Sequence, residues 1–315
     1  MISHEWRKGL QPTHSDENGP SRHPREGGGP ASWIPAFAGM TRKERPPKEH
    51  TPGKVYIVGA GPGAHDLITL RGLRALRLAD VVFYDALVSP ELLAEAPSAD
   101  LIFVGKRCGR HPVEQHETVR MMIERARRGD IVVRLKGGDP MIYGRGGEEA
   151  LACNEALIEY EIIPGVCSAL GAASFAGIPL THRGVASSVA FVTAHSAACL
   201  GKPDLSWGHL VKAVDTLVIF MGGSWLEPIA SALVGFGLPP ETAAAVVSHA
   251  THENQQTVVG SLRDIAQRVK EAHLATPVLI IVGAVAEFGE TLNWFERQRL
   301  VASCTAAEDF PTSAL

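Results

Sequence analysis

The sequence predicts an α/β protein with two domains. Three observations support this fold class: short apolar strand-like runs alternate with helical segments, two of the strands end in glycine-rich loops, and the pattern restarts near residue 187. We expect an N-terminal α/β domain at 54–164, a connector at 165–186 and a C-terminal α/β domain at 187–296, followed by a loose tail at 297–315.

The first domain opens with an apolar run at 55–58, which predicts a strand. Leucines then recur every third residue between 67 and 76, as in an amphipathic helix. Further strands are expected at 81–84, 101–104, 131–135 and 161–163, with helices at 115–128 and about 146–159. Continuous apolar strands that alternate with helices favour a mostly parallel sheet covered on both faces.

The second domain repeats this alternation after a segment of small residues. That segment, which ends at Gly177, predicts a close-packed helix within the connector. Strands are expected at 188–193, 216–220, 243–248, 256–260 and 278–282, with helices near 225–236 and 261–272.

The first 53 residues differ in composition from the rest of the chain. They hold 8 of the 21 prolines and 7 of the 32 glycines without any apolar period, so we expect a disordered extension at 1–53. The stretch 23–41 resembles the translation of a dispersed intergenic repeat of proteobacterial genomes. This resemblance favours a start downstream of Met1, with Met40 as the candidate. A genuine disordered tail and a docking peptide are the alternatives.

Charge and cysteine content argue against several classes. Residues 1–52 carry 8 Lys and Arg against 6 Asp and Glu, which leaves 22 against 28 for the remainder, a net charge of −6. An acidic core without a dense basic run argues against a general nucleic-acid binder. The sequence has no apolar run of about 18 residues that could span a membrane. Five cysteines without C-x-x-C spacing indicate free thiols in a reducing compartment, so we expect a cytoplasmic protein without a zinc site.

The loop at 59–64 follows the first strand and reads Gly-Ala-Gly-Pro-Gly-Ala. It satisfies the dinucleotide fingerprint G-x-G-x-x-A, so an NAD-binding oxidoreductase is one candidate. Pro62, however, lacks the N–H that a phosphate oxygen would require. An adenosine-containing ligand without phosphates tolerates this loss. A tight turn that binds nothing is the remaining alternative.

Polar and glycine residues also follow two other strands. Gly137, Gly138 and Asp139 come after the strand at 131–135, and ligands of open α/β sheets bind at such strand ends. Asp139 could hold a ribose or a cationic group there. Asp85 ends another strand and is a candidate general base, with a loop anchor as the alternative.

Basic residues gather near these strand ends in spite of the acidic total. They are Lys106, Arg107, Arg110, Arg134, Lys136, Arg145 and Arg183. As a set on one rim they would suit a polyanionic ligand, because arginine binds carboxylates through two parallel hydrogen bonds. Solvated surface charge is the alternative for each of them.

Taken in order, these segments resemble the tetrapyrrole methylase family. The resemblance is carried by 58–63, 84–89, 104–107, 134–140, 164–166, 177–183, 220–222 and 292–295. It extends from about 54 to 296 and implies two α/β domains of the tetrapyrrole methylase type, with the active site in the interdomain cleft of a homodimer. This is not the Rossmann-type methyltransferase fold, so the resemblance makes the glycine fingerprint a look-alike.

The resemblance implies methyl transfer from S-adenosylmethionine (SAM) to C2 and C7 of uroporphyrinogen III. The product, precorrin-2, leads to siroheme and cobalamin. The run 144–149 and the residues around Asp85 favour this activity over that of later-acting precorrin methylases. SAM carries its own leaving group, so we expect no metal. Another precorrin methylase and an inactive binding module are the alternatives.

The resemblance also implies roles for single residues. SAM contacts fall on Pro62, Gly137, Gly138, Asp139, Ile142, Cys167, Ser168, Met221 and Ala250. The proton acceptor falls on Asp85 and the proton donor on Lys106. We further expect the eight carboxylates of uroporphyrinogen to bind Arg107, Arg134, Arg145 and Arg183, with Lys106 as a further anchor.

Three positions depart from the family pattern. Cys167 stands where Thr is usual, Ala194 replaces a common Gly, and His116 stands in place of Glu. None of them lies in the glycine loops or at Asp85, so we expect altered affinity more than lost activity.

Overall fold

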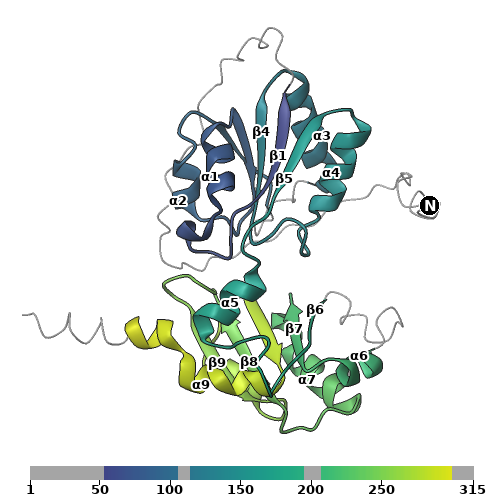
Figure 1. The fold of residues 1–315 in the computed structure, drawn as a ribbon, viewed down its shortest axis with the longest axis vertical. Helices are drawn as coiled ribbons and strands as arrows, with labels where there is room; N and C mark the ends of the chain where they lie inside the picture. The colour runs from purple at the N-terminus through teal and green to yellow at the C-terminus, as the bar shows by residue number, and fades with distance from the viewer. Residues whose placement is uncertain (1–52, 106–113, 195–206, 300–315) are drawn as a thin grey trace, which may run out of the picture. The chain divides into compact units, whose positions relative to one another are not determined.

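The computed structural model describes residues 53–105, 114–194 and 207–299, which form two five-stranded sheets with helices against them (Figure 1). The predicted α/β class is therefore confirmed. Each expected strand occurs, with ends that differ by two residues at most. The expected extension at 1–53 lies outside the described residues, apart from Gly53. Within the described ranges, no helix is long and apolar enough to cross a membrane.

The first sheet is parallel throughout, where a mostly parallel sheet was predicted. Its strands are β1 (Lys54–Gly59), β2 (Val81–Tyr84), β3 (Asp100–Phe103), β4 (Ile131–Lys136) and β5 (Glu159–Ile163), in the order β3-β2-β4-β1-β5. Val58 of β1 lies between Leu135 of β4 and Ile163 of β5. Because the strands run in one direction, the loops that follow them meet at one edge of the sheet.

Two pairs of helices cover this sheet. The helices α1 (Leu70–Arg77) and α2 (Pro90–Ala94) pack on one face, and α3 (Gln115–Arg127) and α4 (Gly146–Glu155) on the other. Helix α1 begins at Thr69, whose hydroxyl accepts a hydrogen bond from the Gly72 N–H at 3.1 Å. Helix α4 ends four residues before the predicted boundary, because Leu157 adopts a left-handed backbone (φ 56°) and turns the chain into β5.

The second sheet is mixed. Its strands are β6 (Val189–Thr193), β7 (Thr216–Phe220), β8 (Ala243–Ser248), β9 (Gln256–Ser261) and β10 (Val278–Val282), in the order β6-β7-β10-β8-β9. The β6–β7 pair is parallel and the other pairs are antiparallel. This arrangement still places the ends of β7 and β8 next to the start of the antiparallel β10.

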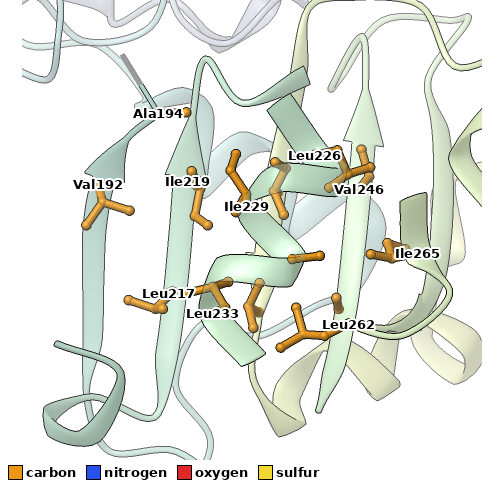
Figure 2. Close-up of a cluster of buried hydrophobic side chains, with 14 of the residues drawn as sticks. Val192, Ala194, Leu217, Ile219, Leu226, Ile229, Leu233, Val246, Leu262 and Ile265 are labelled. Carbon is orange, nitrogen blue, oxygen red and sulfur yellow. The ribbon is translucent and has the colours of Figure 1, made fainter. Parts of the chain in front are cut away.

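Both faces of the second sheet are covered. The helices α6 (Trp207–Ala213), α7 (Leu226–Gly235) and α8 (Ile265–Glu271) pack on one face, where Ile229 and Leu233 of α7 lie over the strands (Figure 2). On the other face lies α5 (Ser168–Ala176), whose alanines allow a close approach. Helix α5 comes from the segment predicted as a connector.

The sequence analysis missed the short helices and misplaced several boundaries. The short elements are α2, α6, α9 (Phe288–Leu292) and the 3₁₀ turns His65–Leu67, Gly223–Trp225 and Ala284–Glu287. They are too short to show a helical period. Residues 297–299 were expected to begin the tail, but they belong to a helix at 294–299. Trp294 fixes this helix by donating its indole N–H to the Ser174 carbonyl oxygen at 2.9 Å.

Three glycines bring the first-sheet loops together. A Cβ atom on Gly59 would lie 2.5 Å from the Gly165 nitrogen, and one on Gly165 would overlap the Gly138 carbonyl oxygen. The backbone that follows β1, β4 and β5 therefore packs without any intervening side chain. This contact determines how close the loops at the sheet edge can come to each other.

We predict that Gly165→Ala lowers the free energy of unfolding by about 3 kcal/mol, because the added methyl group has no space. Gly235→Ala is the matched control, since no atom lies within 4 Å of a Cβ at that position in α7. It should change stability by less than about 1 kcal/mol. Urea unfolding of both variants tests the comparison, and equal stabilities would contradict the close-contact argument.

Candidate active site

A cavity of about 580 Å³ lies at the strand ends of both sheets. The first sheet contributes the loops after β1, β2 and β4, and the second contributes the residues after β7 and β8 and before β10. The wall consists of Gly61, Pro62, 86–90, Gly137, Gly138, Ser168, 220–221, 223–224, Val247, 249–250, His252 and 276–279.

Backbone contacts hold the first-sheet side of the cavity. The Gly138 N–H donates to the Gly61 carbonyl oxygen at 2.6 Å, and both glycines have a positive φ (68° and 87°). Asp139 fixes the adjoining loops. Its carboxylate accepts hydrogen bonds from the N–H of Met141 at 2.8 Å and of Gly165 at 3.1 Å. The side chain of Asp139 therefore serves the loop geometry behind the cavity.

The second-sheet side contains three non-glycine residues in left-handed conformation. Met221 (φ 57°) and His249 (φ 46°) line the cavity, and Thr251 (φ 68°) follows them. The Thr251 hydroxyl accepts a hydrogen bond from the Ala64 N–H at 2.9 Å, which joins the loop after β1 to the loop after β8. Such backbones cost about 1–3 kcal/mol each and cluster where function requires a fixed shape.

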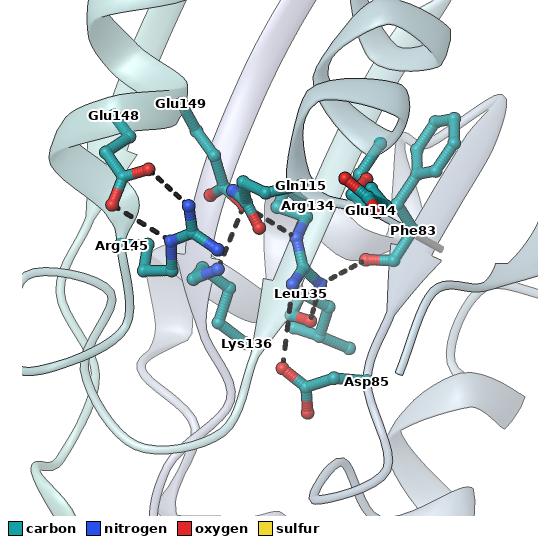
Figure 3. Close-up of polar contacts among 11 residues, drawn as sticks. Phe83, Asp85, Glu114, Gln115, Arg134, Leu135, Lys136, Arg145, Glu148 and Glu149 are labelled. Carbon is teal, nitrogen blue, oxygen red and sulfur yellow. Dashed lines mark hydrogen bonds and ion pairs between the residues drawn. The ribbon is translucent and has the colours of Figure 1, made fainter. Parts of the chain in front are cut away.

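Behind the loops lies a buried charge cluster centred on Glu149 of α4 (Figure 3). One oxygen of this fully buried carboxylate accepts three hydrogen bonds, each of 3.0 Å, from Arg134 Nε, Lys136 Nζ and Gln115 Nε2. The second oxygen, Oε2, has no hydrogen-bond partner among the described residues. Burial, and next the charge of Arg134, lowers the pKa of Lys136, whereas Glu149 acts in the opposite direction.

Asp85 extends this cluster toward the surface. Its Oδ2 lies 3.7 Å from a terminal nitrogen of Arg134, and its side chain is 26% exposed against 6% for Arg134. Its Oδ1 accepts the N–H of Leu87 at 3.1 Å. The Arg134 guanidinium is held in place by Glu149 and by the carbonyl oxygens of Phe83 and Leu135. Asp85 therefore lies against a buried cluster of paired positive and negative charges.

Most of the residues predicted to contact SAM lie in the cavity wall. They are Pro62, Gly137, Gly138, Ser168, Met221 and Ala250. The other three lie outside that wall. Asp139 anchors the loops, Ile142 is 37% exposed, and Cys167 is a buried thiol whose pKa is raised by burial.

The residues predicted to bind substrate carboxylates differ in exposure and in their partners. Arg134 was expected on a rim, but it lies inside the first domain because Glu149 neutralises it there. Arg145 is exposed and binds both oxygens of Glu148, at 2.9 and 2.6 Å. Arg183 is exposed in the turn between α5 and β6. Lys106 and Arg107 lie outside the described residues.

Several cavity residues were missed by the sequence analysis. His249 and His252 both come from the loop after β8, and their rings are 6.4 Å apart. Burial, and next the charge of His249, lowers the pKa of His252. The H-x-x-H spacing after a strand was the available signal. Among the described residues, no group of His, Cys, Asp and Glu could hold a metal ion.

Comparison with protein families gives a match to the Tetrapyrrole (Corrin/Porphyrin) Methylases over residues 54–266. The chain belongs to this family. This membership argues against the NAD-binding interpretation of the loop at 59–64 and confirms the resemblance drawn from the motifs.

Curated relatives include a uroporphyrinogen-III C-methyltransferase and siroheme synthases. The chain is 43% identical to the uroporphyrinogen-III C-methyltransferase of Bacillus subtilis over 79% of its own length and 52% of the relative. It is 44% identical to siroheme synthase 1 of Klebsiella pneumoniae over 85% of its own length and 55% of the relative. The chain therefore spans about half the length of these curated relatives.

Solved structures confirm the fold. The uroporphyrin-III-C-methyltransferase of Thermus thermophilus is 39% identical with a TM-score of 0.65, over 77% of this chain and 97% of that one. Another structure of the enzyme, complexed with S-adenyl homocysteine, has a TM-score of 0.64 at 39% identity and covers 75% and 99% of the two chains. The cobalt precorrin-4 methyltransferase CbiF is 30% identical with a TM-score of 0.66, covering 74% and 95%.

We predict that Glu149→Gln lowers the free energy of unfolding by about 3 kcal/mol, because it leaves two buried cations without their central anion. The amide keeps the oxygen acceptor, and its nitrogen can replace the unpaired Oε2, so the change tests the charge.

Glu148→Gln is the control for this prediction. The residue is adjacent but exposed, and its pair with Arg145 should contribute less than about 1 kcal/mol. Thermal and urea unfolding measure both variants. If the two substitutions cost the same, the cluster does not depend on the charge of Glu149.

Proposed function

We propose that this protein is a SAM-dependent C-methyltransferase that converts uroporphyrinogen III to precorrin-2 by methylation at C2 and C7. This reaction feeds siroheme and cobalamin synthesis. The main support is the convergence of six predicted SAM contacts on one cavity, although they come from widely separated segments. The match over 97% of the Thermus thermophilus enzyme supports the same substrate.

The wall of the cavity fits a methyl donor of this kind. Gly61, Gly137 and Gly138 expose backbone to the cavity, so that a ligand can approach it closely. Pro62 removes an N–H donor, which a phosphate-free nucleoside does not require. When bound, SAM supplies a methyl group on a sulfonium that is already a good leaving group. The task of the chain is to align that methyl group with a pyrrole carbon and to exclude water.

Asp85 is the proposed proton acceptor. It is partly exposed, while Arg134 behind it is fixed by Glu149. This support suits a carboxylate that receives a proton or binds pyrrole N–H groups while keeping one position. Lys106 is the proposed proton donor, on the basis of the family resemblance. In this arrangement Arg134 acts on the substrate through Asp85.

Binding of the substrate carboxylates falls to the remaining basic residues. We assign Arg107, Arg145 and Arg183 to this task, with Lys106 as a further anchor, because uroporphyrinogen carries eight carboxylates. Arg145 and Arg183 are exposed, as such a role requires. We also propose a cytoplasmic homodimer, as the family resemblance and the cysteine content led us to expect.

A different precorrin methylase is the second candidate, since CbiF is also similar in fold and sequence. Incubation of the purified full chain with SAM and uroporphyrinogen III distinguishes the two. We expect a product with two added methyl groups by mass spectrometry. Methylation of a later precorrin without any reaction of uroporphyrinogen III would favour the second candidate.

We predict that Asp85→Asn lowers kcat by about 100-fold or more, because the amide cannot accept a proton as the carboxylate does. Asn can still accept the Leu87 N–H, so the loop should keep its shape. Binding of S-adenosylhomocysteine (SAH) should stay within about twofold of wild type, because Asp85 lies outside the cavity wall.

Asp66→Asn provides the control, because Asp66 is an exposed carboxylate outside the wall. Steady-state kinetics and calorimetric titration with SAH measure the two effects. Unchanged kcat in Asp85→Asn would remove Asp85 from the chemistry, whatever the substrate proves to be.

A further inference from the structure

A short hydrogen-bond chain lies behind one histidine of the cavity wall. The buried hydroxyl of Ser248 donates to the Ala275 carbonyl oxygen at 2.5 Å. The same Ser248 oxygen lies 2.9 Å from Nδ1 of His249. Ser248 ends β8, and Ala275 lies just before β10. The two segments therefore hold this series of hydrogen bonds from both sides.

The hydrogen bonds of Ser248 determine which ring nitrogen of His249 carries the proton. Two oxygens at 2.5 Å must have a proton between them, and the proton can come only from the Ser248 hydroxyl, because a carbonyl has none. The hydroxyl has no second proton to give to His249. His249 must therefore donate from Nδ1–H to the Ser248 oxygen, and a neutral ring then has an unprotonated Nε2.

The second ring nitrogen is left for a ligand. His249 lines the cavity, and its Nε2 has no hydrogen-bond partner among the described residues. It is not one of the fully buried polar atoms without a partner in the described residues, so at least part of its surface is exposed. The nearby ring of His252 is disfavoured as a cation by burial, which lowers its pKa. His249, a residue of the cavity wall, thus offers a hydrogen-bond acceptor at Nε2.

We propose that His249 Nε2 accepts a hydrogen bond from the adenosine half of the methyl donor. The adenine amino group and the ribose hydroxyls are the donors that adenosine offers. His249 lies between Ser248 and Ala250, and Ala250 and Met221 are wall residues already assigned to this ligand. The inference rests on the proposed function, and it assigns to His249 a binding role that the family resemblance did not.

SAH serves as the probe in calorimetric titrations of the full chain. His249→Phe keeps a flat ring but removes the acceptor, so SAH should bind about tenfold more weakly. His249→Gln restores an oxygen acceptor and should fall between wild type and His249→Phe. His273→Phe is the matched control. His273 is an exposed histidine outside the cavity wall with a similar left-handed backbone (φ 51° against 46°). Its substitution should leave SAH binding unchanged.

The role of Ser248 is tested in a double-mutant cycle. Ser248→Ala removes the hydroxyl that fixes the tautomer of His249. It should weaken SAH binding about threefold in the wild-type background. In the His249→Phe background the same change should have no further effect. Equal weakening in both backgrounds would mean that Ser248 acts on the loop shape, and would overturn the inference.

The remaining outcomes are also distinct. Wild-type affinity of His249→Phe for SAH overturns the inference and leaves the proposed function intact. Failure of the wild-type chain to bind SAH removes the proposed function itself. Nitrogen-15 NMR of the neutral His249 ring provides a direct check: we expect a protonated Nδ1 and an unprotonated Nε2, and the opposite tautomer contradicts the proposal.

Discussion

The contact among the backbones of Gly59, Gly138 and Gly165 is the constraint on which the site depends. No Cβ atom fits between these three strand ends, so the loops after β1, β4 and β5 share one close-packed edge. Asp139 extends the same contact by accepting the Gly165 N–H. A larger residue at Gly59 or Gly165 would separate the loops that form one side of the cavity. The glycines therefore shape the cavity before any ligand contact is considered.

The buried position of β4 also explains how its charged residues are paired. Arg134 and Lys136 belong to a strand that is buried from Val132 onward, so their charges need a partner inside the domain. Glu149 supplies it with one oxygen that accepts from both. The cost of burying this cluster is offset only if the geometry is maintained. Asp85, at the end of β2, is the partly exposed carboxylate that lies next to this buried cluster.

Sequence patterns predicted the elements that depend only on the residues within one short segment. Apolar runs gave the strands, and the glycine loops pointed to the correct edge of the first sheet. The burial of Arg134 could not be predicted in this way, because its partner Glu149 comes from another element and is brought near only by the packing of α4 on the sheet. Helix α2 is similarly hidden, since five residues cannot show a period. The position of His249 depends on a hydrogen bond to a segment 27 residues away from Ser248.

The two sides of the cavity obtain their shape by different means. On the first-sheet side, glycines with positive φ leave the backbone uncovered. On the second-sheet side, Met221 and His249 adopt left-handed backbones while keeping their side chains. A left-handed glycine would be less costly, but it would offer no thioether and no imidazole to a ligand. The cost of these left-handed backbones fits a wall with two kinds of side. The second-sheet side contributes side-chain contacts, and the first-sheet side lets a ligand approach the backbone closely. In the function proposed above, a methyl group on a sulfonium needs such two-sided restraint, because its transfer requires one alignment with the accepting carbon.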